Sequence, residues 1–77
     1  MMNNRMPRII LMRIIGNTIK AAREERGILQ KELADAIGVS DAEISRWESG
    51  IRLPTTEHIR SLCQHLSIDA NIILGLL

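Results

Sequence analysis

The stretch QKELADAIGVSDAEISRWES, residues 30–49, decides the fold of this 77-residue chain. Its apolar residues recur three or four positions apart in two short runs, and this spacing predicts two helices over about 30–37 and 41–49. Ala34 is small where the two helices must cross closely, and Gly38 stands where the chain turns, because positive φ costs glycine little. Two short helices joined by a turn of about three residues have the spacing of a helix-turn-helix.

The second of these helices opens with two acidic residues that have a local structural reason. Ser40 and Glu43 predict a capping box, in which the serine oxygen accepts from a backbone N–H and the glutamate reaches back to the cap. Asp41 lies in the first turn, where a negative charge interacts favourably with the helix dipole. The two acids therefore do not argue against a nucleic-acid partner.

The same helix has an apolar inner face and a small, polar outer face. Ile44 and Trp47 point inward, and we expect Trp47 in the core because stacking on nucleic acid suits single strands better than a duplex. The outer face carries small or hydrogen-bonding residues and one guanidinium: Ala42, Ser45, Arg46 and Ser49. Such a surface can approach base edges closely, and Arg46 is the best candidate for a bidentate contact with guanine. The alternatives for Arg46 are a phosphate contact or a solvated side chain.

The rest of the chain predicts three further helices, over about 15–26, 56–66 and 70–74, and no strand alternation. Each helix is too short to be stable alone, so the expected fold is a compact all-α bundle of five helices. We divide the chain into a domain over 14–77 and an N-terminal extension over 1–13. That extension could be a disordered tail, a dimer contact, an extra turn of the first helix or a strand.

The composition is that of a globular protein, with 45% hydrophobic and 25% charged residues. The formal net charge of +1 neither indicates nor excludes a nucleic-acid partner. A single cysteine, Cys63, allows no internal disulfide and fits a reducing cytosol, so we expect a cytoplasmic protein. No run is long enough to span a bilayer. The apolar stretch after Arg5 and Arg8 is interrupted by Arg13 and has no cleavage site, so we expect no secretion.

No arrangement of residues in the sequence indicates catalysis or a metal site. His58 and His65 lie seven positions apart, too far to share one ion without other ligands, and Cys63 falls on the apolar stripe of its helix. We therefore expect two surface histidines and a core cysteine. We also expect no enzyme, no cofactor and no metal, and no small-molecule effector is evident.

Specific motifs follow one another from the end of the first helix onward. They are R-x-x-R-G at 23–27, Q-K-E-L-A at 30–34, I-S-R-W-E-S-G at 44–50, then Pro54 and L-S-I-D at 66–69. With these motifs, IGNTIKAAREERGILQKELADAIGVSDAEISRWESGIRLPTTEHIRSLCQHLSIDANIILGLL resembles the phage repressor/Cro-like (XRE-type) helix-turn-helix proteins. The resemblance implies a five-helix, lambda-repressor-like bundle whose third helix lies in the major groove of DNA. It also implies dimers that read two half-sites.

Carried over position by position, the resemblance implies roles for individual side chains. Gln30 would hydrogen-bond a phosphate and brace the third helix, and Arg23 would pair with Glu48 to join the first and third helices. The base-facing positions are held by Asp41, Ala42, Ser45 and Arg46. Basic residues that are candidates for phosphate contacts are Lys20, Lys31, Arg52 and Arg60.

The chain also departs from the pattern of this family. Leu29 stands where a Ser, Thr or Asn cap is usual, which would cost about 1 kcal/mol if nothing replaces the cap. Asp41 could accept a hydrogen bond from cytosine N4, or it could repel the phosphate backbone. Ile51 replaces a residue that is commonly basic, although Arg52 remains.

Taken together, the residues and the resemblance predict a sequence-specific, double-stranded DNA-binding transcriptional regulator. It would act as a repressor or as an autoregulating protein such as an antitoxin or a restriction controller. The apolar segments 70–77 and 9–15 predict a homodimer, unless both fold back on their own core. The rival interpretation is a helix-turn-helix scaffold for protein–protein contact, which the near-zero net charge and Asp41 favour. A basic rim around the base-facing residues would indicate DNA, and a neutral or apolar patch there would indicate a protein partner.

Overall fold

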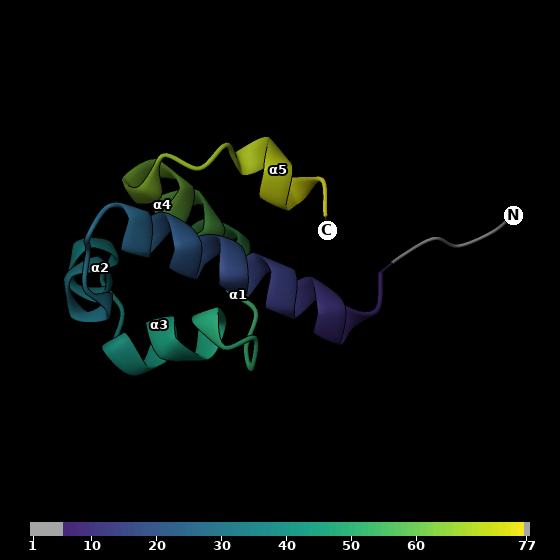
Figure 1. Ribbon diagram of the computed structural model, residues 1–77, viewed down its shortest axis with the longest axis horizontal. Coiled ribbons are helices and arrows are strands. Elements are labelled where there is room, and N and C mark those ends of the chain that lie inside the picture. The colour runs from purple at the N-terminus through teal and green to yellow at the C-terminus, as the bar shows by residue number, and fades with distance from the viewer. Residues whose placement is uncertain (1–5, 77) are drawn as a thin grey trace, which may run out of the picture.

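The computed structural model describes residues 6–76 as five helices and their connections (Figure 1). They are α1 (Arg8–Glu25), α2 (Gln30–Ile37), α3 (Asp41–Glu48), α4 (Thr56–Leu66) and α5 (Ala70–Leu74). In Figure 1, α3 lies below α1, α4 and α5 lie above it, and α2 closes the end of the molecule opposite the N-terminus. No strand occurs in the described part, and the predicted all-α, five-helix fold is confirmed. None of these helices is both long enough and apolar enough to cross a membrane.

α1 is longer than the sequence indicated, because it begins at Arg8 and not near Ile15. Pro7 is the N-cap residue, where the missing N–H of proline costs no helical hydrogen bond. Residues 8–14 contain no glycine or proline that would stop the helix. Extra helical turns, one of the four alternatives, therefore describe this segment, while residues 1–5 lie outside the described part of the chain.

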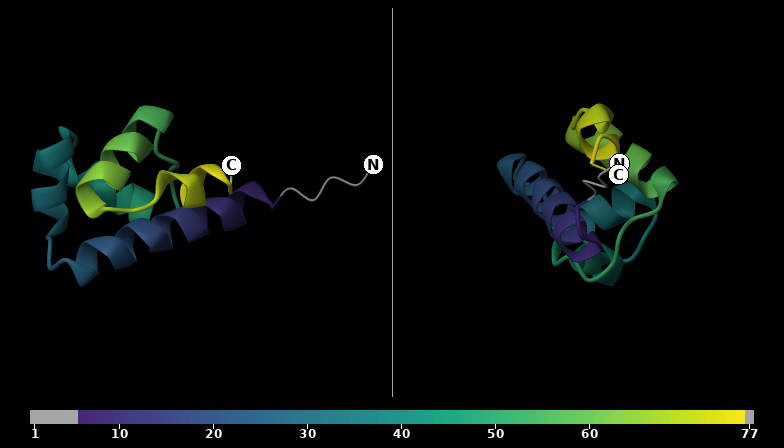
Figure 2. Two further views of the ribbon diagram at one scale, coloured as in Figure 1. Left: turned by 90° about the horizontal axis from the view of Figure 1, so that it is seen from above. Right: turned by 90° about the vertical axis from the view of Figure 1, so that its right-hand side faces the viewer.

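The core lies between the helices and is aliphatic apart from one tryptophan. The largest fully buried side chains come from all five helices and are Ile15, Ile19, Leu33, Ile44, Trp47, Leu62, Leu66 and Ile73. Burying an aliphatic side chain of this size contributes about 1.5–3 kcal/mol. Because such short helices are unstable alone, this shared core holds all five in place. Figure 2 shows the same packing from two further directions, with α1 running along the rest of the bundle.

Capping side chains and one glycine set the ends of the short helices. Thr55 Oγ1 accepts from the His58 N–H at the start of α4, at 3.2 Å. Asp69, the N-cap residue of α5, accepts from the Asn71 N–H at 2.9 Å. Gly38 ends α2 with a φ of 78°, in the left-handed region that glycine adopts most easily. The α2–α3 turn therefore forms where the sequence predicted it.

Arg26 ties the end of α1 to the end of α4. Its Nε donates to the carbonyl oxygen of Leu66 at 2.8 Å, across 40 residues of sequence. Carbonyls in the last turn of a helix have no partner within the helix, so this side chain supplies one. The second arginine of the R-x-x-R-G motif thus has a structural role.

Candidate nucleic-acid interface

The inner face of α3 is anchored in the domain by two buried apolar residues and one buried carboxylate. Ile44 and Trp47 have almost no exposed surface. Glu48 is 6% exposed and accepts hydrogen bonds from Arg23 Nε at 2.6 Å and from Arg23 Nη2 at 3.0 Å. Bidentate pairing of this kind is the strongest form of an arginine–carboxylate contact. The structure therefore contains the expected pair between α1 and α3.

The Arg23–Glu48 pair belongs to a larger hydrogen-bond network. Gln30 Nε2 donates to Glu48 Oε1 at 2.9 Å, and Arg23 Nη1 donates to the carbonyl oxygen of Ile28 at 2.8 Å. The hydrogen bond to Glu48 raises the pKa of Arg23, against burial, which lowers it, so the guanidinium stays charged. This network joins α1, the α1–α2 connection, α2 and α3, and it fixes the orientation of α3.

Gly16 allows α1 to cross the end of α3 at very close range. A Cβ atom at this position would lie 2.3 Å from the carbonyl oxygen of Trp47 and 2.8 Å from that of Glu48. Both oxygens belong to the backbone and cannot rotate away, so no larger residue fits. Sequence reasoning missed this role, although a glycine inside a helical pattern is a signal of close packing.

α3 presents the four expected base-facing side chains, Asp41, Ala42, Ser45 and Arg46, to solvent. The Arg46 side chain keeps 48% of its surface exposed, and its Nη1 lies 3.8 Å from Glu43 Oε1. An exposed ion pair contributes at most about 1 kcal/mol, so the guanidinium can leave Glu43 for a ligand. None of the four lies beneath another part of the described chain, which is what reading a groove requires.

The chain turns away sharply at the end of α3. The Ser49 hydroxyl donates to the carbonyl oxygen of Ser45 at 2.9 Å, and Gly50 adopts a φ of 78°. The Ile51 N–H then donates to the carbonyl oxygen of Arg46 at 3.0 Å. These contacts end α3 after two turns, so its outer face stays free of covering chain.

The capping box expected at α3 is only half present, and the cap expected to be missing at α2 is partly replaced. Ser40 Oγ accepts from the Glu43 N–H at 3.1 Å, but the carboxylate of Glu43 lies beside Arg46 and makes no recorded bond back to the cap. At α2, Leu29 has no side-chain acceptor, but its own N–H donates to Glu32 Oε1 at 2.8 Å. Glu32 therefore offsets part of the cost expected for the missing cap.

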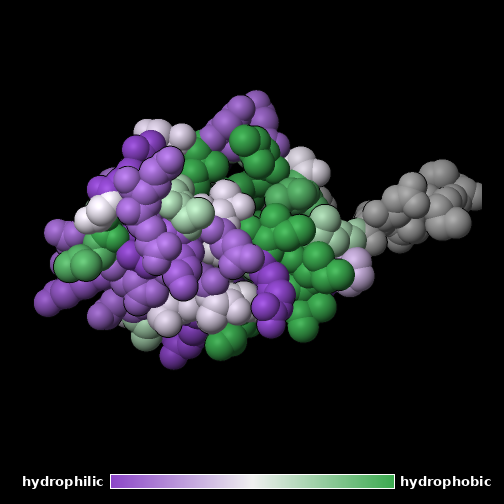
Figure 3. Space-filling view, viewed as in Figure 1, coloured by the Kyte–Doolittle hydropathy of each residue, from purple (hydrophilic) through white to green (hydrophobic). Residues whose placement is uncertain are grey.

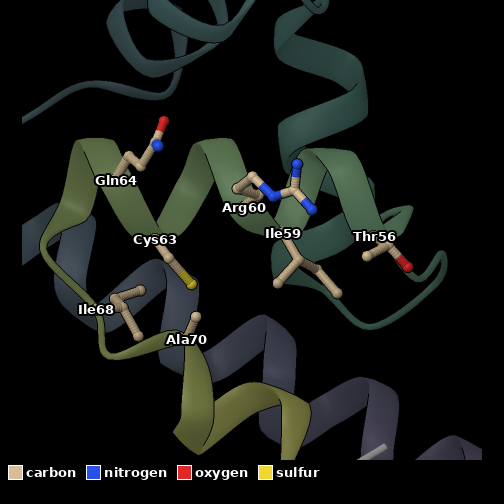
Figure 4. A pocket seen from close by; sticks show the side chains of 7 residues that line it. All are labelled: Thr56, Ile59, Arg60, Cys63, Gln64, Ile68 and Ala70. Atoms are coloured by element: carbon tan, nitrogen blue, oxygen red, sulfur yellow. The ribbon is translucent and has the colours of Figure 1, made fainter.

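The four candidate phosphate contacts are exposed but lie on separate elements. They are Lys20 on α1, Lys31 on α2, Arg52 after α3 and Arg60 on α4. Arg60 lines a hollow of about 330 Å³ between α4 and the start of α5, together with Cys63 and Ala70 (Figure 4). The structure does not bring Arg60 to the outer face of α3.

The sequence profile of the helix-turn-helix family matches residues 19–73, which is most of the chain and includes both helices of the motif. The chain is a member of the XRE-type helix-turn-helix family. Domains of this family are typically not enzymes.

Two relatives and one crystal structure show how far the resemblance of this XRE-type chain extends. It is 34% identical over 62 residues to the antitoxin PezA of Streptococcus pneumoniae, covering 80% of this chain and 39% of PezA. It is 32% identical to the ImmF control region 10 kDa protein of Bacillus phage phi105, covering 77% of this chain and 66% of that protein. The clp gene regulator ClgR from Corynebacterium glutamicum superposes with a TM-score of 0.79 at 27% identity, over 91% of this chain and 74% of that one. The chain therefore spans less than half the length of PezA.

The histidines and the cysteine of this XRE-type domain do not gather into a metal site in residues 6–76. Cys63 is buried on the apolar face of α4, as expected, and burial, helped by the charge of Asp69, raises the pKa of its thiol. His58 is not the surface residue that we expected. Its ring packs against Trp47 with the ring centroids 4.9 Å apart, and its Nδ1 is buried without a recorded hydrogen-bond partner. His58 therefore belongs to the support behind α3.

Proposed function

We propose that this XRE-type domain binds double-stranded DNA in a sequence-specific manner and acts as a transcriptional repressor or autoregulator. The observation that carries the proposal is the division of α3 into two faces. Ile44, Trp47 and Glu48 are buried and fix the helix, while the small and polar side chains of the opposite face are exposed. An α-helix is about 10–12 Å wide with its side chains, and the major groove is about 12 Å wide.

The exposed side chains of α3 suit different base edges. Arg46 can donate two hydrogen bonds to O6 and N7 of guanine, and the methyl group of Ala42 can contact a thymine methyl group. Asp41 can accept from cytosine N4, and Ser45 can donate or accept. This combination would read a short mixed sequence, with Arg46 supplying the largest part of the discrimination.

Residues outside α3 would position the domain on the DNA backbone. Lys31 and Gln30 lie at the start of α2, and Arg52 follows α3. Gln30 Nε2 carries two hydrogens and gives one to Glu48, so the second remains available for a phosphate oxygen. Contacts of this kind set register and orientation but do not read sequence.

We also propose that the domain is a homodimer. Large apolar side chains are exposed at the end of the molecule where α1 begins and α5 lies, namely Met6, Ile9, Ile10 and Ile72, and we call these four residues the apolar end. Figure 3 shows the largest hydrophobic area of this face gathered over this end, while most of the remaining surface is polar. Soluble monomers rarely expose large contiguous apolar patches. A symmetric pair would present two copies of α3 to two half-sites.

Analytical ultracentrifugation tests the dimer. The wild type should sediment as a dimer at micromolar concentrations, and Ile72→Glu should sediment as a monomer. Leu29→Glu is the matched control, because Leu29 is equally exposed at 65% against 60% for Ile72, but lies at the start of α2. A wild-type monomer would refute the dimer.

Selection from a random pool of duplex DNA tests the DNA-binding function. The wild type should enrich a short motif, with two copies about 10 base pairs apart if the dimer binds as proposed. Binding to the motif should weaken steeply as salt is raised, because phosphate contacts release counterions. Failure to enrich any motif would refute the proposal.

A protein-binding role is the second candidate, and the similarity to the antitoxin PezA, over 39% of that protein, favours it. In that case the apolar end would hold another protein and not a second copy of this chain. An absence of enriched DNA, together with a monomeric wild type, would support this candidate over the first.

A further inference from the structure

The first turns of α1 carry two arginines that lie beside the C-terminal end of α3. Arg8 and Arg13 form one side of an open hollow of about 520 Å³, and the turn Ser49–Ile51 forms the other. We call Arg8 and Arg13 the arginine pair. Both residues precede Ile19, where the match to the family begins, so the family profile assigns them no role.

Direct packing places Arg13, one member of the arginine pair, against the turn after α3. A Cβ atom at Gly50 would lie 3.3 Å from Arg13 Cα and 3.3 Å from Arg13 Cγ, so the backbone of α1 touches this turn. α1 and α3 run side by side in opposite directions, and the start of α1 extends past the end of α3 (Figure 1). The arginine pair therefore lies next to the proposed reading face, just beyond its C-terminal end.

The two segments that line this hollow carry basic residues and no acidic ones. No Asp or Glu occurs in residues 6–23 or in residues 49–56, while Arg8, Arg13, Lys20 and Arg52 in these segments are all exposed. The ion pairs recorded among residues 6–76 involve Arg23 and Arg46 as their cations, not Arg8 or Arg13. Positive charge is thus concentrated beside α3 although the whole chain carries only +1.

Stability of the fold does not explain Arg8. It is the first residue of α1, and the first turn holds no acidic residue. A positive charge near the start of a helix is disfavoured by the helix dipole, by about 0.3–1 kcal/mol at an exposed site. The charge is therefore unfavourable for the helix itself, and no ion pair within residues 6–76 offsets this cost.

We propose that Arg8 and Arg13 bind backbone phosphates of the DNA that flanks the base pairs read by α3. The inference rests on the proposed function, and it extends the bound site beyond what residues 19–73 could cover. Exposed Ile51 borders the hollow and can lie against deoxyribose, while the two guanidinium groups pair with phosphate oxygens. The contacts add affinity but no sequence preference.

Fluorescence anisotropy with the selected duplex tests this inference. Three proteins are compared between about 50 and 200 mM salt: the wild type, Arg8→Ala/Arg13→Ala, and Arg60→Ala. Arg60→Ala is the charge-matched control, because Arg60 faces the hollow between α4 and α5. Each lost phosphate contact should lower the slope of log affinity against log salt by about 0.9, so the double variant should lose about 1.8 per bound protomer, or about 3.6 for a dimer, and the control nothing.

Neutral methylphosphonate linkages in the duplex locate the contacts. Placed at the phosphates beside the base pairs read by α3, they should weaken binding of the wild type and leave binding of the double variant unaffected, because that variant no longer contacts these phosphates. Circular dichroism and sedimentation should show the same helix content and the same oligomeric state for all three proteins.

The outcomes separate this inference from the function on which it rests. A wild type that binds the selected duplex as tightly and with the same salt slope as Arg8→Ala/Arg13→Ala overturns the inference alone. A change of oligomeric state in the double variant also overturns it, because the arginines would then act in assembly. A wild type that binds no duplex overturns the proposed function and the inference together.

Discussion

The guanidinium of Arg23 on α1 holds both carboxylate oxygens of Glu48, the last residue of α3, at 2.6 and 3.0 Å. Both side chains are buried, with 10% and 3% of their surfaces exposed. The pair therefore fixes where α3 lies relative to α1, and Gln30 secures the same carboxylate from α2. The face that α3 offers to a ligand depends on this internal contact.

Replacing Glu48 by alanine should destabilise the fold strongly. The change leaves the buried charge of Arg23 without its partner, a loss of about 3–5 kcal/mol in the free energy of unfolding. Urea denaturation followed by circular dichroism measures it. Glu24→Ala is the control, since Glu24 is exposed and lies 4.0 Å from Arg23 Nη2, so its loss should stay under about 1 kcal/mol. Equal losses in the two variants would contradict the role given to the buried pair.

Replacing Gly16 by alanine should also destabilise the fold, although alanine is normally the better helix former by about 1 kcal/mol. The added Cβ would lie 2.3 Å from the carbonyl oxygen of Trp47, so α1 and α3 must move apart. We expect a loss of about 1–3 kcal/mol, the range for overpacked cores. The control Asn17→Ala, at an exposed position of the same helix, should not lower the free energy of unfolding. A stabilised Gly16→Ala variant would show that the close crossing is absent.

The thiol of Cys63 should make stability depend on pH in the alkaline range. Burial raises its pKa in the folded state, so the unfolded chain loses the proton first as the pH rises. The free energy of unfolding should therefore be unaffected below the ordinary cysteine pKa of about 8.5 and decline above it. Cys63→Ala has no thiol and lacks this pH dependence. The difference in the free energy of unfolding between the wild type and the variant should therefore shrink with rising pH. A difference that is constant from neutral to alkaline pH would refute the prediction.

The short helices around the turn were the most predictable part of the fold. Ser40, Gly38 and the spacing of Ile44 and Trp47 act through local geometry, and each lies where the sequence indicated. The Arg23–Glu48 pair followed from the family resemblance and not from the spacing of residues. Local signals and a resemblance therefore supplied most of the architecture.

Features that depend on contacts between distant segments could not be predicted from the sequence. The start of α1 was left open because residues 9–15 are apolar apart from Arg13 and show little amphipathic contrast. His58 looked like a surface residue, since nothing in its neighbourhood in the sequence indicates that its ring meets Trp47. Arg26 finds its acceptor 40 residues away, at Leu66. For His58 and Arg26, the partner comes close only in the folded chain.

Base readout by Arg46 on α3 is best tested by measuring the affinity of Arg46→Ala for the selected duplex and for single-base variants of it. We expect the variant to lose about 1–3 kcal/mol in the free energy of binding and to show a relaxed preference at one base pair. The free energy of unfolding of Arg46→Ala should stay within about 0.5 kcal/mol of the wild-type value, because Arg46 is exposed. Arg60→Ala should bind and discriminate as the wild type does. Unchanged affinity and unchanged base preference in Arg46→Ala would contradict base readout by Arg46.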